Sequence, residues 1–182
     1  VIDDNFTAEG VAIRGEVGTL GTWAETGPGV WSNTMVFSED GEYQFQMEVT
    51  DRAGNKSALF TSESFTIDKT APQMTVTWDG PESGTGLGTG GESFYNKDRV
   101  ATVTIVERNF DPALVNKTGS GNLSAWSRNG DVNTATVSFT EDGPHEFSIS
   151  AADKAGNKTD DYTSGGFYIH KGEPRVDVRG VS

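Results

Sequence analysis

Residues 37–41 read FSEDG and residues 139–143 read FTEDG, so the second stretch follows the first at a distance of 102 residues. The correspondence continues without a gap for 36 positions, 16 of which are identical. Its best-kept part is D-x-A-G-N-K, which occurs at 51–56 and again at 153–158. A period near 100 residues is too long for solenoid repeats of about 20–50 residues, and it indicates a string of small independent domains.

Apolar and polar residues alternate within each copy with a period of two, which is typical of β-strands. In the second copy, Val103 and Ile105 alternate with threonines, and Phe147, Ile149 and Ala151 alternate with polar residues. Asp-Gly and Ala-Gly-Asn turn signals separate such runs, and we find no run with the 3.6-residue period of a helix. The pattern predicts an all-β chain in which each copy is a Greek-key β-sandwich of about seven short strands.

The repeat also sets the expected domain boundaries. Residues 70–172 are predicted to form one complete domain, and residues 1–69 a domain that lacks its N-terminal strand or strands. By the same register, the first copy needs about thirty residues before Val1 (72 − 102 = −30). Residues 173–182 match the opening of the second copy and are expected to be the start of a third repeat or a linker. We therefore expect the chain to be a piece of a longer array.

The composition excludes several kinds of partner and site. Lys and Arg total 14 against 27 Asp and Glu, and the net charge of −13 disfavours nucleic acid and anionic membranes as partners. The chain has no cysteine, which rules out disulfides, zinc–thiolate sites and cysteine nucleophiles. No apolar run approaches the roughly 18 residues of a spanning helix, so we expect no membrane insertion. The glycine-rich stretch at 80–91 lacks the Lys-Ser or Lys-Thr of a phosphate-binding loop and is expected to be a mobile connection.

Several segments resemble the bacterial Ig-like domains that are repeated in Gram-positive cell-surface proteins. They are residues 68–72 (DKTAP), 95–99 (YNKDR), 107–111 (ERNFD) and the block from 141 to 157, with Trp126 between them. The resemblance implies tandem immunoglobulin-like Greek-key β-sandwiches. It also implies an extracellular location, on the bacterial cell surface or in the cell wall.

The segment E-x-G-x-Y-x-F at residues 39–45 resembles the corner motif of immunoglobulin domains, with Phe45 where those domains have a cysteine. The resemblance implies that the hydroxyl of Tyr43 bonds the backbone a few residues upstream. In the second copy His145 takes the place of this tyrosine, which leaves open whether the bond forms there.

The resemblance favours a non-catalytic function as a stalk, spacer or adhesion module whose partners are the neighbouring Ig-like repeats of the same chain. The alternative is a module that binds a ligand, such as a host glycan or a matrix protein, and that is attached to an enzyme elsewhere in the parent chain. Ligand binding needs solvent-facing rings, and the candidates are Trp31, Tyr95 and Tyr162. Trp78 alternates with Val76 and is therefore predicted to face the core.

Catalysis is not expected. His145 and His170 occupy repeat positions that hold Tyr43 and Asp68 in the other copy, so neither belongs to a shared site. Carboxylates that are close in sequence are expected to be solvated or to cap turns. These pairs are Glu107 with Asp111 and Glu141 with Asp142.

We expect no cofactor, although calcium is an alternative because its oxygen ligands are abundant in this chain. The candidate ligands are Asp51, Asp68, Asp98 and Asp153. Lys69, Lys97 and Asn157 are candidates for an internal isopeptide bond, but no diagnostic spacing supports them.

Overall fold

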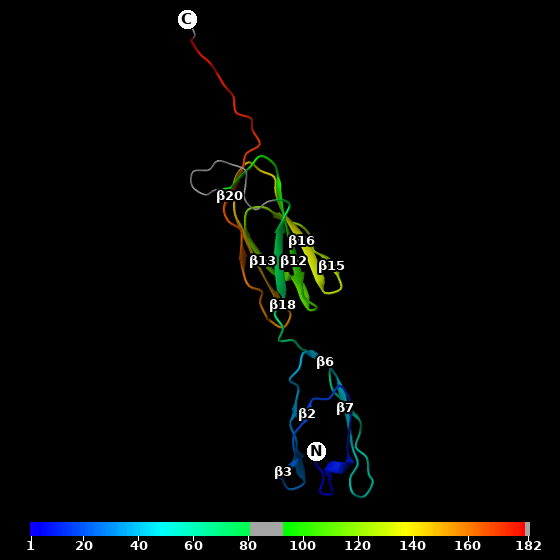
Figure 1. The fold of residues 1–182 in the computed structure, drawn as a ribbon. Coiled ribbons are helices and arrows are strands. Elements are labelled where there is room, and N and C mark those ends of the chain that lie inside the picture. The colour runs from blue at the N-terminus through cyan, green and yellow to red at the C-terminus, as the bar shows by residue number, and fades with distance from the viewer. Residues whose placement is uncertain (81–92, 181–182) are drawn as a thin grey trace. The chain divides into compact units, whose positions relative to one another are not determined.

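The computed structural model describes residues 1–80 and 93–180 and divides into two compact units, Val1–Thr70 and Ala71–Ser182 (Figure 1). The regular structure of these residues consists of β-strands and one 3₁₀ turn, η1 (Ala8–Gly10). The predicted all-β fold of immunoglobulin-like sandwiches is confirmed. Nowhere in the described residues is there a helix long and apolar enough to cross a membrane. The connection predicted at 80–91 lies, from residue 81 onward, outside the described residues.

The second unit contains a large sheet with the strand order β10-β12-β16-β14, in which β15 also pairs with β16. Two three-stranded sheets complete it, β13-β18-β19 and β11-β20-β17. Every pairing is antiparallel except that of β11 with β20, which is parallel. The strands are β10 (Gln73–Trp78), β11 (Ser93–Tyr95), β12 (Arg99–Val106), β13 (Phe110–Gly119), β14 (Asn122–Leu123), β15 (Ser127–Asn129), β16 (Val132–Phe139), β17 (Gly143–His145), β18 (Phe147–Asp153), β19 (Tyr162–Thr163) and β20 (Phe167–Ile169).

Side chains from all these sheets meet in one core. Ala101, Val103 and Ile105 of β12 are completely buried, and the residues between them are only half-buried. Phe147 and Ile149 of β18 belong to the same cluster. Full burial of an aliphatic or aromatic side chain stabilises a fold by about 1.5–3 kcal/mol relative to its exposure. The alternation of period two therefore predicted the inward faces of these strands correctly.

The D-x-A-G-N motif forms the same turn in both units. In the second unit, Asp153 accepts hydrogen bonds from the backbone N–H and the side-chain amide of Asn157, at 2.9 and 2.8 Å. In the first unit, Asp51 accepts the same two bonds from Asn55, each at 2.8 Å. The side-chain bond and then the backbone bond from Asn55 lower the pKa of Asp51. The motif is thus a local turn that aspartate and asparagine stabilise together.

The corner bond also forms in both units. The hydroxyl of Tyr43 donates to the carbonyl of Glu39 at 2.6 Å. In the second unit, Nε2 of His145 lies 2.8 Å from the carbonyl of Glu141, which is again four residues upstream. Nδ1 of the same ring lies 3.2 Å from Oγ of Ser120. The question left open by the sequence is answered, because an imidazole with its proton on Nε2 replaces the phenol as the donor.

The first unit repeats this arrangement only in part. Its sheets are β1-β7-β8, β2-β5, β3-β4 and β6-β9. Residues 1–70 hold no counterpart of β10 or β11, and of β12 only its end has one, since Ile2 pairs with Val30 as Val106 pairs with Val132. Phe65, the counterpart of the buried Phe167, is 38% exposed. The strands are β1 (Val11–Gly15), β2 (Thr19–Leu20), β3 (Ala24–Gly27), β4 (Val30–Ser32), β5 (Met35–Val36), β6 (Gly41–Tyr43), β7 (Phe45–Val49), β8 (Phe60–Thr61) and β9 (Phe65–Ile67).

Residues 173–180 form no strand, although their sequence resembles the segment that opens β10. Val176 and Val178 are 89% and 75% exposed. The sequence alternates as a strand does, but these residues have no neighbouring strand to pair with in the described part of the chain.

The difference in core packing can be tested with a matched pair of substitutions. Ile149→Ala removes a completely buried side chain and is expected to lower the free energy of unfolding of the second unit by about 2–5 kcal/mol. Met47→Ala removes the half-buried counterpart in the first unit and should cost less than half as much. Chemical denaturation of the chain, followed separately for each unit, measures both values. Equal losses would contradict the difference in packing.

The corner bond of the second unit can be tested at His145. His145→Tyr should keep the free energy of unfolding within about 0.5 kcal/mol of its original value, because a phenol makes this bond in the first unit. His145→Phe keeps a ring but loses the donor, and it should cost about 0.5–1.5 kcal/mol. The same denaturation experiment compares the two variants. If phenylalanine were tolerated as well as tyrosine, the bond would not contribute to stability.

Candidate functional site

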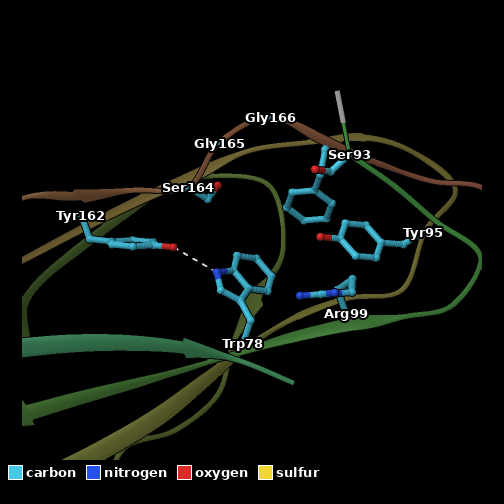
Figure 2. A pocket seen from close by; sticks show the side chains of 9 residues that line it. Trp78, Ser93, Tyr95, Arg99, Tyr162, Ser164, Gly165 and Gly166 are labelled. Carbon is cyan, nitrogen blue, oxygen red and sulfur yellow. Dashed lines mark hydrogen bonds between the residues drawn. The ribbon is translucent and has the colours of Figure 1, made fainter. Parts of the chain in front are cut away.

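A cavity of about 100 Å³ lies in the second unit, where the ends of several strands converge (Figure 2). Trp78 ends β10, Tyr95 ends β11 and Arg99 begins β12, while Tyr162 begins β19. Segments that are far apart in the sequence therefore bring four large side chains to one place. The lining residues are Trp78, Ser93, Tyr95, Arg99, Tyr162, Ser164, Gly165, Gly166 and Phe167.

Arg99 places a buried positive charge in the wall of this cavity. Its side chain is 2% exposed, and Nε lies 3.2 Å from Oδ1 of Asp79, a residue that is partly open to solvent. The guanidinium carbon lies 4.0 Å from the centre of the Tyr95 ring and 5.1 Å from that of the Trp78 ring. The ion pair and the two cation–π contacts offset part of the free energy that burial of this charge costs.

Hydrogen bonds fix the other polar side chains around the cavity. The indole Nε1 of Trp78 donates to the hydroxyl of Tyr162 at 3.0 Å, which Figure 2 shows as a dashed line. Oγ of Ser164 accepts a bond from the backbone N–H of Phe147 at 3.0 Å. Because a serine hydroxyl both accepts and donates, Ser164 keeps its own hydrogen available for a group in the cavity.

Two of the three aromatic residues predicted to contact a ligand line this cavity. Tyr95 is only 8% exposed, so it is not the solvent-facing ring that was expected; its ring packs edge-on against Phe167. Tyr162 is half-buried. Trp78 faces the core as predicted, with its ring stacked 5.6 Å from that of Phe139. The sequence did not single out Arg99, because a lone arginine at the start of a strand carries no motif.

Trp31, the third predicted aromatic residue, lies in the first unit. It borders an apolar groove of about 350 Å³. Its ring lies 5.0 Å from the ring of Phe6, which also contacts Trp23 at 4.9 Å. Trp31 is therefore part of an aromatic cluster. The other residues that line the groove are Val1, Ile13, Leu20, Trp23, Ser32, Asn33, Met35, Phe45, Met47 and Phe60.

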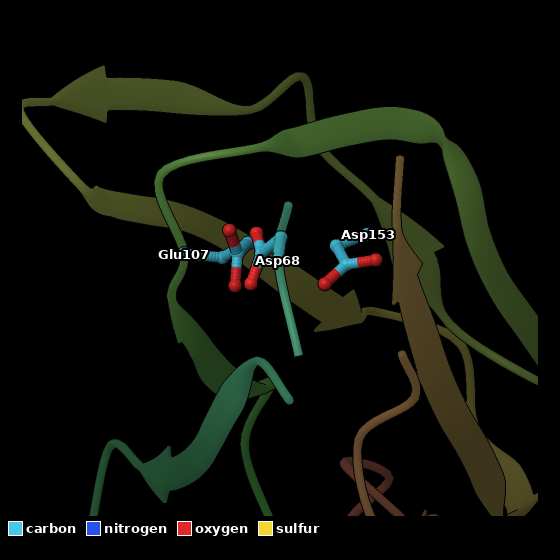
Figure 3. A group of neighbouring side chains, drawn as sticks. All are labelled: Asp68, Glu107 and Asp153. Carbon is cyan, nitrogen blue, oxygen red and sulfur yellow. The ribbon is translucent and has the colours of Figure 1, made fainter. Parts of the chain in front are cut away.

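Two buried carboxylates lie close together at the D-x-A-G-N turn of the second unit. Carboxylate oxygens of Glu107 and Asp153 lie within 4.8 Å of each other, and the two residues are 7% and 1% exposed (Figure 3). Oε1 of Glu107 accepts a hydrogen bond from the backbone N–H of Asn109 at 2.5 Å. Glu107 was expected to be solvated or to cap a turn; it is buried, and it caps its turn through the bond from Asn109. Oxygen atoms in such a pair are of the type that calcium prefers.

The other calcium candidates have hydrogen-bond or ion-pair partners of their own. Asp51 holds the turn of the first unit through Asn55. Asp68 accepts a hydrogen bond from the backbone N–H of Thr70 at 3.1 Å. Asp98 pairs with the ammonium group of Lys171 at 2.8 Å. Within the second unit, Asp153 is thus the candidate that has another carboxylate beside it.

The residues proposed for an isopeptide bond have other polar partners. Nζ of Lys69 donates to the carbonyl of Ser38 at 2.6 Å, and its backbone N–H donates to Asp40. The side-chain amide of Asn157 is bonded to Asp153. Lys97 is exposed.

The two histidines have structural surroundings. His145 forms the corner bond, and its other ring nitrogen lies near Ser120. Oγ of Ser120 also lies 3.1 Å from both the backbone N–H and the carbonyl of Glu146, so this serine joins two chain segments. His170 is 74% exposed and lies 3.6 Å from Asp142.

The comparisons with known proteins bear on the first unit. Residues 22–69 match a protein-family model described as a bacterial Ig-like domain. No curated protein matches the chain. The matched segment covers β3 to β9, with the corner tyrosine and the D-x-A-G-N turn. It confirms the resemblance found in the sequence and identifies residues 22–69 as a bacterial Ig-like domain.

Proposed function

We propose that the chain is a non-catalytic part of a bacterial surface protein, in which Ig-like repeats serve as a stalk or spacer and contact their neighbours in the same chain. Domains of this family are generally not enzymes and are typically found outside the cell or on its surface. The net charge of −13 favours solubility and disfavours adsorption to anionic polymers.

The parallel pairing of β11 with β20 carries this proposal. β11 belongs to the N-terminal part of the second unit and β20 closes it, and Ser93 pairs with Phe167 and Tyr95 with Ile169. β11 follows β10, the first strand of the unit, and tension that reaches β11 and β20 draws these two parallel strands in opposite directions along their length. Their hydrogen bonds are then loaded together, since none can open before its neighbours. Such an arrangement resists tension, which is what a spacer at a cell surface must do.

Further contacts strengthen the end of this pair. The backbone N–H of His170 donates to the carbonyl of Tyr95 at 2.8 Å. Directly after it, Nζ of Lys171 bonds Asp98 at 2.8 Å and the carbonyl of Thr140 at 2.6 Å. The hydrogen bond to Asp98 raises the pKa of Lys171. An exposed ion pair adds at most about 1 kcal/mol, so the backbone bonds carry most of the load.

His170→Pro tests the spacer function. Proline removes the N–H that bonds Tyr95, and we expect a lower main unfolding force of the second unit in single-molecule pulling, with a loss in the free energy of unfolding of only about 0.5–1.5 kcal/mol. Asp68→Pro, at the same repeat position in the first unit, is the matched control and should leave that force unchanged. An unchanged force in His170→Pro would show that the β11–β20 pair bears no load.

The stability of the fold is expected to be independent of calcium. Both oxygens of Asp153 already accept hydrogen bonds from Asn157, and Glu107 accepts one from Asn109, so the turn is held by the chain's own amides. Calorimetry should give the same melting temperatures in excess calcium and in EDTA. A higher melting temperature of the second unit in calcium, abolished by Glu107→Gln, would contradict this expectation.

A further inference from the structure

The cavity of Figure 2 differs from the remainder of the core in its chemistry. The core cluster of the second unit consists of aliphatic and aromatic residues, whereas the cavity wall joins four aromatic rings to a guanidinium group and two serine hydroxyls. Aromatic surface with a few convergent polar groups is typical of sites for small ligands.

Two glycines border this cavity, and the fold does not require them. A Cβ atom at Gly165 or Gly166 would meet no atom within 4 Å, and neither residue has a left-handed backbone conformation. The corresponding residues of the first unit are Glu63 and Ser64, 102 positions earlier. Glycine in place of a residue with a side chain lowers stability by about 0.5–1 kcal/mol. Its effect here is to leave the cavity bordered by backbone alone.

The buried charge of Arg99 is a second feature that packing alone does not require. A well-packed apolar side chain generally stabilises a buried position at least as well as an ion pair does. Arg99 instead lies beside Asp79, and both residues offer planar groups with several hydrogen-bonding positions. Such planar groups suit adjacent hydroxyls, which donate to a carboxylate and accept from a guanidinium.

The charge of the protein and the size of the cavity narrow the class of ligand. The net charge of −13 repels anions. Among the described residues, Arg99 is the only cationic side chain that lines the cavity, and Asp79 balances its charge. A water molecule needs about 10–15 Å³ of such space and benzene fits a cavity of about 150 Å³, so 100 Å³ accepts several waters or one edge of a six-membered ring whose remainder lies outside the cavity. A neutral ring with apolar C–H faces and hydroxyl edges matches both the aromatic and the polar walls.

We propose that this cavity, lined by Trp78, Tyr95, Arg99, Tyr162 and Ser164, binds one neutral pyranose ring at the end of a glycan. The ring of Tyr162 contacts the C–H groups of the sugar, and Arg99 and Ser164 bond its hydroxyls. This recognition goes beyond the spacer function and does not depend on it, because it uses the cavity and not the β11–β20 pair.

The test is a titration of the complete 182-residue chain with methyl glycosides of galactose, mannose and N-acetylglucosamine, and with the anionic methyl glucuronide. Ligand-observed NMR and the fluorescence of the tryptophans report binding. At least one neutral glycoside should saturate the protein with a Kd of about 1 mM, a value reasonable for so small a ligand. The glucuronide should bind more weakly.

Gly165→Leu places a side chain at the cavity border and should weaken binding of that glycoside at least tenfold without lowering the melting temperature. Glu63→Leu, at the same repeat position in the first unit, is the matched control and should bind as the unaltered chain does. Three results would each overturn the proposal. They are no saturable binding of any neutral glycoside, binding that Gly165→Leu leaves unchanged, and tighter binding of the glucuronide than of the neutral sugars.

Discussion

The burial of β12 is the interaction on which the second unit depends. This strand lies between β10 and β16, and Ala101, Val103 and Ile105 enter the same core as the side chains of β18. Among residues 1–70, only Val1 and Ile2 correspond to the end of β12, and Met47 and Phe45 of β7 border an apolar groove. Related sequences therefore reach different degrees of burial, because the burial of one strand is decided by the strands packed against it.

The polar elements of the repeat follow a different rule. The D-x-A-G-N turn and the corner bond have nearly the same geometry in both units, although the cores differ. The lysine after the last strand is also alike in both units, since Lys69 and Lys171 each bond a carbonyl beside the Asp-Gly turn at 2.6 Å. These bonds join residues within a turn or on adjacent strands, so they form wherever the local sequence is present.

The same division explains how much could be predicted from the sequence. Two features that depend on the local sequence pattern were predicted correctly. They are the alternation of buried and exposed residues along the strands and the orientation of Trp78 toward the core. The burial of Glu107 and Tyr95 was not predicted, because it depends on segments from elsewhere in the chain that pack over these residues. The cavity around Arg99 was beyond prediction for the same reason, since it joins Trp78 and residues of the segment 93–99 with residues of the segment 162–167. The corner bond of His145 could have been inferred, since an imidazole can donate a proton as a phenol does.

The central claim is that β12 closes the core of the second unit, whereas β7 in the described residues of the first unit is only half-buried. Amide hydrogen exchange of the intact chain tests this claim most directly, because protection reports the free energy of opening at each position. The account predicts that the amides of Val103, Val137 and Ile149 exchange only through global unfolding of the second unit, and that the amide of Met47 exchanges orders of magnitude faster. Equal protection of Met47 and Ile149 would contradict it.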